Sequence, residues 1–482
     1  MSSRQNTSSS WLWYMLGIVA LARLLTLGLY PLTDTTEARY GEVARKMAEL
    51  GNWVTPLYDY GVPFWAKPPL TTWLSAISMK LFGVNEFAVR LPYFLLAVLI
   101  AWLLWDWVRR ASSRQAQLAT AMMSGTLLYF VASAAVMTDL GLVLGTTLAM
   151  RGFWAAFEQG ESGRPKEVWL LFIGLGIGLL AKGPIAVVLS GLPIGLWMLL
   201  TGHIKASWQR LPWLKGSLLT FAIAAPWYIM AEIRTPGFWE YFFIGEHWNR
   251  FTVTGWAGDK YGTAHATQRG AIWLFALAAV MPWTALLPLL WIGRKPAPAP
   301  QNAEPAKYSR HFTAYLLAWS LGPCLFFTMS GNILWTYVLP ALPAMALLAA
   351  RWLSRDARAR WVDGVVAAGV LAMSLLVAAF FLREELADSW KSAKTVVQAH
   401  QTSASGQPLL FMGDLPYSAS FYSQGTARAL PGNAELEQRL RAGPAFVALN
   451  PDQATALSQE LQAKLKLQAT SGAYKLYSTV QK

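Results

Sequence analysis

The sequence has few of the residues from which soluble proteins build disulfides, zinc sites or a solvated surface. It holds one cysteine in 482 residues, and only 14% of its residues are charged. A single cysteine excludes an intramolecular disulfide framework and a paired-cysteine zinc site, and a soluble domain would have about 25% charged residues. The sequence also lacks a glycine-rich phosphate loop and an HExxH motif, so it gives no support for chemistry on nucleotide phosphates.

Apolar residues dominate the composition instead. Hydrophobic residues make up 55% of the chain, and they form runs of roughly 17–22 residues, each long enough to cross about 30 Å of hydrocarbon. The pattern predicts an all-α polytopic membrane protein with about eleven spans. We expect the spans near 11–32, 90–108, 117–137, 140–157, 168–182, 184–200, 214–231, 270–292, 312–329, 334–350 and 362–382.

The distribution of basic residues predicts the orientation of these spans. Lys and Arg number 40 against 26 Asp and Glu, and the excess falls in loops on one side of the predicted map. Basic loops of a membrane protein usually remain in the cytoplasm, so the net charge of +14 does not indicate a nucleic-acid partner. The loops 33–89, 232–269 and 330–333, the turn at Asp139 and the tail after residue 383 then face outward.

The chain divides into two predicted domains, residues 1–383 in the membrane and residues 384–482 outside it. In the second domain, PLLFMGD and AFVALN have the apolar character of short buried strands. The segment 451–464 predicts a helix, and LKLQATSGAYKLYS predicts a final pair of strands. We therefore expect a small C-terminal α/β domain. In the first outer loop, 36–50 and 70–83 have helical spacing and predict juxtamembrane helices.

The first outer loop is the longest polar interruption in the chain and the first candidate site. Asp34 and Glu37 are its leading acids. Their spacing also fits a capping box, in which both side chains bond to the start of a helix, and this alternative stays open. Lys67 is an outward-facing cation that opposes the usual charge bias. It predicts an anionic partner such as a lipid phosphate, although contact with ordinary phospholipid head groups is an alternative.

Other outer turns add ionisable residues. Asp139 lies in a very short turn between two apolar runs, and ionisable groups held at the ends of spans usually face a cavity rather than lipid. The loop 236–251 combines Glu246, His247 and Arg250 with many aromatic residues, which suits binding of a sugar or a phosphate. Tyr337 follows a further outer turn.

The motifs in these loops are similar to those of a known family. Thr36-Glu37-Ala38-Arg39-Tyr40, Phe64-Trp65-Ala66-Lys67-Pro68, Glu246-His247 with Arg250-Phe251, and Thr336-Tyr337 with Leu339-Pro340 resemble the lipid A aminoarabinose transferases. These enzymes belong to the GT-C type of transferases that use polyprenyl-phosphate sugars, as do the protein O-mannosyltransferases.

The resemblance implies a GT-C fold and a glycosyltransferase activity. The enzyme would move a sugar from a polyprenyl (undecaprenyl) phosphate to a lipid, glycan or protein acceptor at the periplasmic face of the bacterial inner membrane. Lipid A, lipopolysaccharide or another envelope glycan is the expected acceptor. The implied roles are catalysis by Asp34, Glu37 and Asp139, binding of the donor phosphate by Arg39, Arg45, Lys67 and Tyr337, and binding of sugar or acceptor by Tyr40, Trp65, Glu246, His247 and Arg250.

Two departures from the family pattern limit what it implies. Thr36 stands where the family has an aspartate, and Ala66 replaces the glutamate that is associated with a metal in the family. We therefore expect a different sugar or acceptor, no required cofactor and no metal site with His247. We also expect contacts with membrane lipids and a monomeric chain. A flippase for lipid-linked sugars is the alternative function, but it would need ionisable residues spread along a path through the spans.

Overall fold

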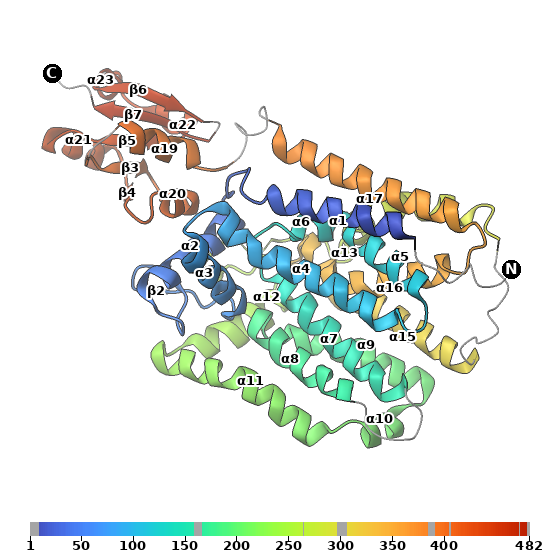
Figure 1. Ribbon diagram of the computed structural model, residues 1–482. Helices are drawn as coiled ribbons and strands as arrows, with labels where there is room; N and C mark the ends of the chain where they lie inside the picture. The colour runs from blue at the N-terminus through green and yellow to red at the C-terminus, as the bar shows by residue number, and fades with distance from the viewer. Residues whose placement is uncertain are drawn as a thin grey trace.

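The structure of the chain is a computed structural model that describes residues 9–158, 166–263, 265–295, 306–383, 391–403, 406–471 and 473–479. Most of these residues form one helical bundle (Figure 1). Its helices are α1 (Ser10–Leu25), α4 (Glu86–Val108), α5 (Ser113–Ser124), α6 (Leu127–Ala132), α7 (Asp139–Glu158), α8 (Trp169–Lys182), α9 (Ile185–Thr201), α10 (Ile204–Arg210), α11 (Trp213–Arg234), α13 (Ile272–Ala279), α14 (Trp283–Trp291), α15 (Ala306–Thr328), α16 (Leu342–Leu353) and α17 (Ala359–Leu382).

Several helices of the bundle are long and apolar enough to span a membrane. Within the described residues, five pass that test by length and composition, or six if α13 and α14, which meet at a bend of 73°, count as one span. The predicted run 117–137 is divided into α5 and α6 at Gly125. The prediction of a helical membrane protein is confirmed, and the number of eleven spans stays a prediction.

Helices α7 and α8 pack through glycines, and this contact positions the site. A Cβ at Gly145 would lie 2.7 Å from the carbonyl oxygen of Gly174, and one at Gly174 would lie 2.4 Å from the oxygen of Gly145. Only glycine permits such an approach of two backbones, as in other membrane helix pairs. The close packing brings the first residue of α7, Asp139, beside the last residue of α8, Lys182.

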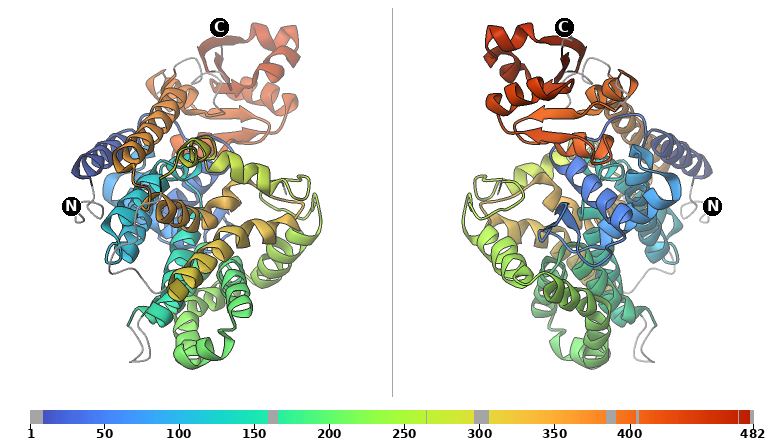
Figure 2. Two further views of the ribbon diagram at one scale, coloured as in Figure 1. Left: turned by 90° about the vertical axis from the view of Figure 1, so that its right-hand side faces the viewer. Right: turned by 90° about the vertical axis from the view of Figure 1, so that its left-hand side faces the viewer.

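The first outer loop is ordered by two helices, as its spacing predicted. Helices α2 (Thr36–Leu50) and α3 (Leu70–Phe82) flank a short hairpin of β1 (Leu57–Asp59) and β2 (Val62–Pro63). Helix α2 ends at Gly51, whose φ of 67° is the left-handed conformation that favours glycine. The loop thus forms a folded cap on one end of the bundle (Figure 2).

The C-terminal unit, residues 391–479 without 404, 405 and 472, contains a five-stranded sheet of order β4-β3-β5-β7-β6. Strand β3 (Leu409–Met412) pairs in parallel with β4 (Arg428–Leu430) and β5 (Phe446–Leu449), whereas β7 (Lys475–Thr479) runs antiparallel to β5 and β6 (Leu465–Thr470). The other elements are helices: α19 (Lys394–Ser403), α20 (Tyr417–Tyr422), α21 (Asn433–Ala442), α22 (Pro451–Ala456) and α23 (Gln459–Ala463).

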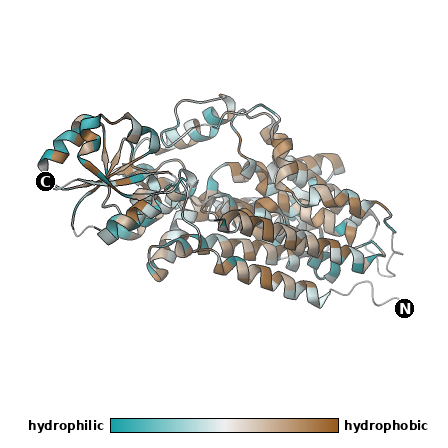
Figure 3. Cartoon of the chain, turned by 90° about the horizontal axis from the view of Figure 1, so that it is seen from above, coloured by the Kyte–Doolittle hydropathy of each residue, from teal (hydrophilic) through white to brown (hydrophobic). Residues whose placement is uncertain are grey.

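The strands predicted in this unit are present, but the single helix predicted over 451–464 is wrong. It is divided into α22 and α23 because Ser458 starts a new helix, accepting a hydrogen bond from the amide of Leu461. The unit is more hydrophilic than the bundle (Figure 3). It rests on the first outer loop through α20, whose Phe421 lies 3.6 Å from the position a Cβ would take at Gly41 of α2. The predicted domain boundary after residue 383 adjoins 384–390, which lie outside the described residues.

Candidate functional site

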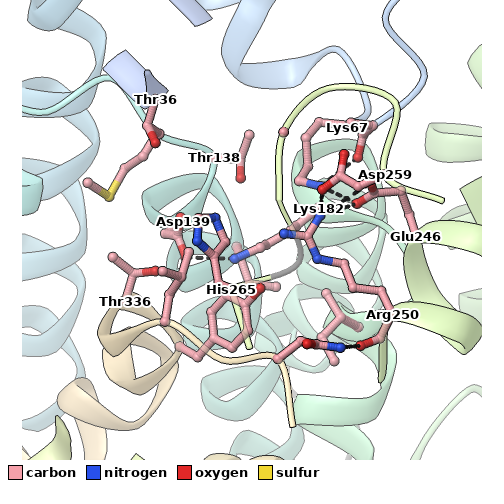
Figure 4. Close-up of a pocket in the computed structure, with 18 of the residues that line it drawn as sticks. Thr36, Lys67, Thr138, Asp139, Lys182, Glu246, Arg250, Asp259, His265 and Thr336 are labelled. Carbon is pink, nitrogen blue, oxygen red and sulfur yellow. Dashed lines mark hydrogen bonds and ion pairs between the residues drawn. The ribbon is translucent and has the colours of Figure 1, made fainter. Parts of the chain in front are cut away.

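A cavity of about 510 Å³ lies between the loop 33–89 and the ends of α7, α8 and α9. Figure 4 shows the charged side chains that converge on it. The predicted residues that line it are Arg39, Tyr40, Lys67, Asp139, Glu246, His247, Arg250 and Tyr337. Apolar side chains also line it, among them Leu142, Ile185, Leu189, Phe327 and Pro340. The lining of the cavity therefore combines charged and apolar side chains.

One group in the cavity is the ion pair at the α7–α8 contact. The ammonium nitrogen of Lys182 lies 2.7 Å from Oδ1 of Asp139 and 4.7 Å from the ring centre of Tyr337. Both side chains are mostly buried, with 13% and 10% exposed. Gly183 allows the chain to turn directly after Lys182, since its φ is 88° and an added Cβ would lie 2.6 Å from Phe242.

A second group joins three elements around a buried carboxylate. Glu246, on the π-helix η3 (Glu240–Asn249), lies 2.9 Å from Lys67 and 3.2 Å from Arg250. Arg250 also pairs with Asp259 at 3.1 Å. Burial alone would raise the pKa of Glu246, but the charges of Lys67 and Arg250 hold it at about 2. The carboxylate is therefore ionised and fixes both cations.

His247 and Arg39 contact backbone carbonyl oxygens in the cavity and not carboxylates. The ring nitrogens of His247 face the carbonyl oxygens of Phe242 at 2.8 Å and Lys182 at 3.3 Å, and burial lowers its pKa. Arg39 donates to the carbonyl oxygen of Tyr261, forms no ion pair among the described residues, and keeps a buried Nε without a hydrogen-bond partner. Arg39 is therefore the cation most open to an added anion.

The structure places Asp34 and Glu37 away from the cavity. Asp34 accepts hydrogen bonds from the backbone amide and the hydroxyl of Ser418 in the C-terminal unit, so it does not form the predicted capping box. Glu37 pairs with the fully buried Arg90, at 2.7 Å between Oε2 and Nη2. Each carboxylate has a structural partner, and neither lines the cavity.

The side chains of Arg45 and Trp65 also lie outside the cavity. Arg45 is held between Glu42 and Glu49 at 2.6 and 2.8 Å, because it lies on the face of α2 that turns away from the cavity. The indole nitrogen of Trp65 donates to Thr235 at 3.1 Å. Both residues support the loop from outside the cavity.

Sequence analysis missed several residues that line the cavity. Asp259, His265 and Tyr417 belong to segments without a family motif, and Thr36 was noted only as a departure. Lys182 was not missed: with Gly183 and Pro184 it interrupts an apolar run, which predicts an ammonium group near an outer or mid-membrane cavity, and it lines this cavity. Its partnership with Asp139 could have been predicted from the adjacent outer ends of α7 and α8.

The described residues do not fit a metal at this site. They contain no group of three or more His, Cys, Asp or Glu side chains placed to hold an ion. Ala66 lines the cavity without a ligand atom, and both nitrogens of His247 face backbone carbonyls.

Comparisons with known proteins agree with the motifs. Residues 13–242 match the model of the dolichyl-phosphate-mannose-protein mannosyltransferase family. The chain is 32% identical over 341 residues to the undecaprenyl phosphate-alpha-4-amino-4-deoxy-L-arabinose arabinosyl transferase of Erwinia tasmaniensis, covering 69% of this chain and 57% of that protein. The enzyme of the same name from Aeromonas hydrophila is 32% identical over 335 residues, covering 68% and 57%. The match thus spans under two thirds of the length of these relatives.

A solved structure extends the similarity to the fold. The crystal structure of ArnT from Cupriavidus metallidurans bound to undecaprenyl phosphate superposes with a TM-score of 0.77 at 19% identity, covering 98% of this chain and 99% of that chain. The same protein in the apo state gives a TM-score of 0.75. The resemblance that the motifs indicated is confirmed, and the chain has the fold of ArnT.

Proposed function

We propose that the chain is a glycosyltransferase that moves a sugar from a polyprenyl (undecaprenyl) phosphate to an acceptor of the cell envelope. The observation that carries the proposal is the cavity, whose lining combines charged and apolar side chains. A prenyl chain would contact the apolar side chains, and the phosphate would lie among the cations. The names of the similar proteins, which include the words undecaprenyl phosphate, support the same donor.

The charge of the cavity suits this donor. Four cations (Arg39, Lys67, Lys182 and Arg250) face three carboxylates (Asp139, Glu246 and Asp259), which leaves one positive charge in excess. A sugar joined to a prenyl chain through phosphate carries one negative charge, so the donor would neutralise the cavity. The buried and unpartnered Nε atoms of Arg39 and Arg250 are available donors, and charge-assisted bonds to phosphate are strong.

Asp139 is the cavity carboxylate that we assign to catalysis. It is buried and is held by Lys182. As in glycoside hydrolysis, a sugar that leaves its phosphate gains positive character at the anomeric carbon, and a fixed carboxylate stabilises that charge without reorganisation. Lys67, Arg39 and Arg250 stabilise the departing phosphate. Asp34 and Glu37 have no part in this assignment.

The location follows from the orientation predicted by the basic loops. The cavity would open to the periplasm of a bacterial inner membrane, with about eleven spans, the domains 1–383 and 384–482, and a monomeric chain. Lipid A, lipopolysaccharide or another envelope glycan would be the acceptor, with Tyr40 and Tyr337 placed to contact sugar.

The test is transfer by purified protein in lipid nanodiscs. A radiolabelled undecaprenyl-phosphate sugar is offered together with an envelope lipid and glycan extract, and labelled acceptor is expected. Lys182→Ala should abolish transfer, and the exposed Lys464→Ala is the control. The proposal is refuted if no undecaprenyl-phosphate sugar binds or is consumed, whichever sugar is offered.

A further inference from the structure

Transfer to a hydroxyl leaves a proton that some group in the cavity must take. The three carboxylates of the cavity are poorly suited to this task, because each is held by a cation: Asp139 by Lys182, Glu246 by Lys67 and Arg250, and Asp259 by Arg250. A base held at a pKa of about 2, as Glu246 is, has little driving force to accept a proton near neutral pH.

Two histidines line the cavity, and both ring nitrogens of His247 face backbone carbonyl oxygens. His265 is the histidine that remains. It lines the cavity, and it forms no hydrogen bond or ion pair with any residue in the described part of the chain. Burial lowers its pKa below the ordinary value; nearby Arg250 and Arg39 act in the same direction, and Asp259 opposes them. These influences favour the neutral imidazole, which has a nitrogen lone pair to offer.

The backbone holds His265 in an unusual conformation. Its φ of 56° is in the left-handed region, which non-glycine residues seldom adopt. The segment is fixed directly after it, since the amide of Thr267 donates to the carbonyl oxygen of Gly331 at 2.8 Å and Ala266 pairs with Asn332. Strain that a fold maintains at a cavity wall is typical of functional residues.

Asn332 connects the segment after His265 to the segment that carries Arg250. Its side-chain amide donates to the carbonyl oxygens of Arg250 and Val253, each at 2.6 Å, and its Oδ1 accepts from the amide of Gly255 at 2.8 Å. A Cβ at Gly331 would lie 2.1 Å from Oγ1 of Thr254, so only glycine fits there. The loop that carries His265 is thus positioned relative to Arg250.

From this geometry we infer that His265 is the general base of the transfer and that the acceptor is a hydroxyl. The inference rests on the proposed function. The acceptor oxygen forms a bond to the anomeric carbon as the bond from that carbon to the phosphate oxygen breaks. The electron pair leaves with the undecaprenyl phosphate, and the hydroxyl proton passes to a ring nitrogen of His265. A phosphate acceptor, whose second proton has a pKa of about 6, would need no base at neutral pH.

The test replaces His265 by asparagine, because asparagine tolerates the left-handed conformation but cannot act as the base. In nanodiscs, His265→Asn should lower kcat by about 10²–10⁴-fold with KM for the donor within a few-fold of wild type. The wild type should lose rate at acidic pH as His265 becomes protonated, and this loss should be absent from His265→Asn. Added imidazole should restore part of the rate. His400→Gln, in the C-terminal unit, is the control.

Three results separate the outcomes. Wild-type kcat and an unchanged pH profile in His265→Asn would refute the base assignment alone, as would a change confined to KM. Efficient transfer to a phosphate acceptor, with His265→Asn as active as wild type, would refute the acceptor class. If the wild type transfers no sugar, the proposed function fails and this inference fails with it. Binding of undecaprenyl phosphate by His265→Asn and by a second variant, His265→Gln, shows that both variants are folded.

Discussion

The ion pair between Glu37 and Arg90 offers a sharp test of what the first-loop acid does. Two hydrogen bonds of 2.8 and 2.7 Å join the guanidinium to the carboxylate, and Arg90 also donates to the carbonyl oxygens of Leu27 and Tyr30. Arg90 is 0% exposed. Glu37→Gln keeps the shape of the side chain but leaves the buried guanidinium without its counter-charge.

Removing one partner of a buried pair costs about 3–5 kcal/mol, because the remaining charge stays buried and uncompensated. We therefore expect Glu37→Gln to unfold at a clearly lower temperature in detergent. Transfer per folded molecule should stay within a few-fold of wild type, since Glu37 does not reach the cavity. The double variant Glu37→Gln/Arg90→Gln should lose less stability than the sum of its single variants, as expected for groups in contact.

Asp139→Asn is the matching variant inside the cavity, and it should lose transfer where Glu37→Gln keeps it. The fixed carboxylate is removed where positive charge develops, so kcat should fall by about 10²–10³-fold while the folded protein still binds undecaprenyl phosphate. The reasoning is refuted if Glu37→Gln unfolds like wild type and loses transfer. In that case the acid of α2 acts in catalysis, and the observed pairing with Arg90 does not describe its role.

Three further predictions concern the cations, the C-terminal contact and pH. Lys67→Ala should weaken binding of undecaprenyl phosphate by about 10–150-fold, because a charge-assisted contact contributes about 1.5–3 kcal/mol. Titration with labelled lipid measures this affinity. An equal loss of affinity in the exposed control Lys80→Ala would contradict the prediction. Asp34→Asn should keep transfer within a few-fold of wild type but speed hydrogen exchange at the amide of Ser418; loss of transfer in folded protein would restore Asp34 as a catalytic acid. Glu246 has a pKa below its ordinary value of 4.5, at about 2, so it stabilises the fold above pH 4.5 and loses that effect as the pH falls through 2. The midpoint temperature of unfolding of Glu246→Gln should therefore lie below that of wild type at pH 7, and the difference between the two should shrink from pH 4.5 downward. A difference in midpoint temperature that does not change with pH would contradict the low pKa of Glu246.

Sequence alone predicted residues of the outward-facing loops and turns. Asp139 lies in the turn between two predicted spans, Lys67 in the loop 33–89 and Glu246 in the loop 232–269, and one orientation places all three segments on the same side of the membrane. Their convergence on one cavity is therefore a consequence of topology, which composition reveals. The structure adds which carboxylate faces which cation.

The residues of α2 show where sequence reasoning was incomplete. Thr36, Arg39 and Tyr40 line the cavity, and their spacing of three and four residues places them on one face of the helix. Glu37 lies about 100° around the helix from Thr36, on the side where it pairs with Arg90. The helix was predicted with its correct bounds, so this assignment of faces was available from the sequence, but the motif drew attention to Glu37 instead.

His265 could not have been predicted, because its position depends on long-range contacts. The segment carrying it pairs with residues 331 and 332, which follow α15 in the chain. No periodicity or motif connects two irregular segments so far apart in sequence. The same applies to Asp34, whose partner Ser418 belongs to the C-terminal unit.

The C-terminal unit contributes to the cavity as well as resting on the bundle. Tyr417 lines the cavity, and its hydroxyl lies in hydrogen-bond contact with that of Tyr58 in the first outer loop. Tyr422 of the same short helix donates to Glu86 at 2.9 Å and accepts from the amide of Leu32 at 2.7 Å. Since Leu32 and Tyr58 lie on either side of α2, helix α20 fixes the helix that carries Arg39. The wall of the cavity is therefore built from both parts of the chain, and a fragment ending at residue 383 would lack the contacts that set the position of α2.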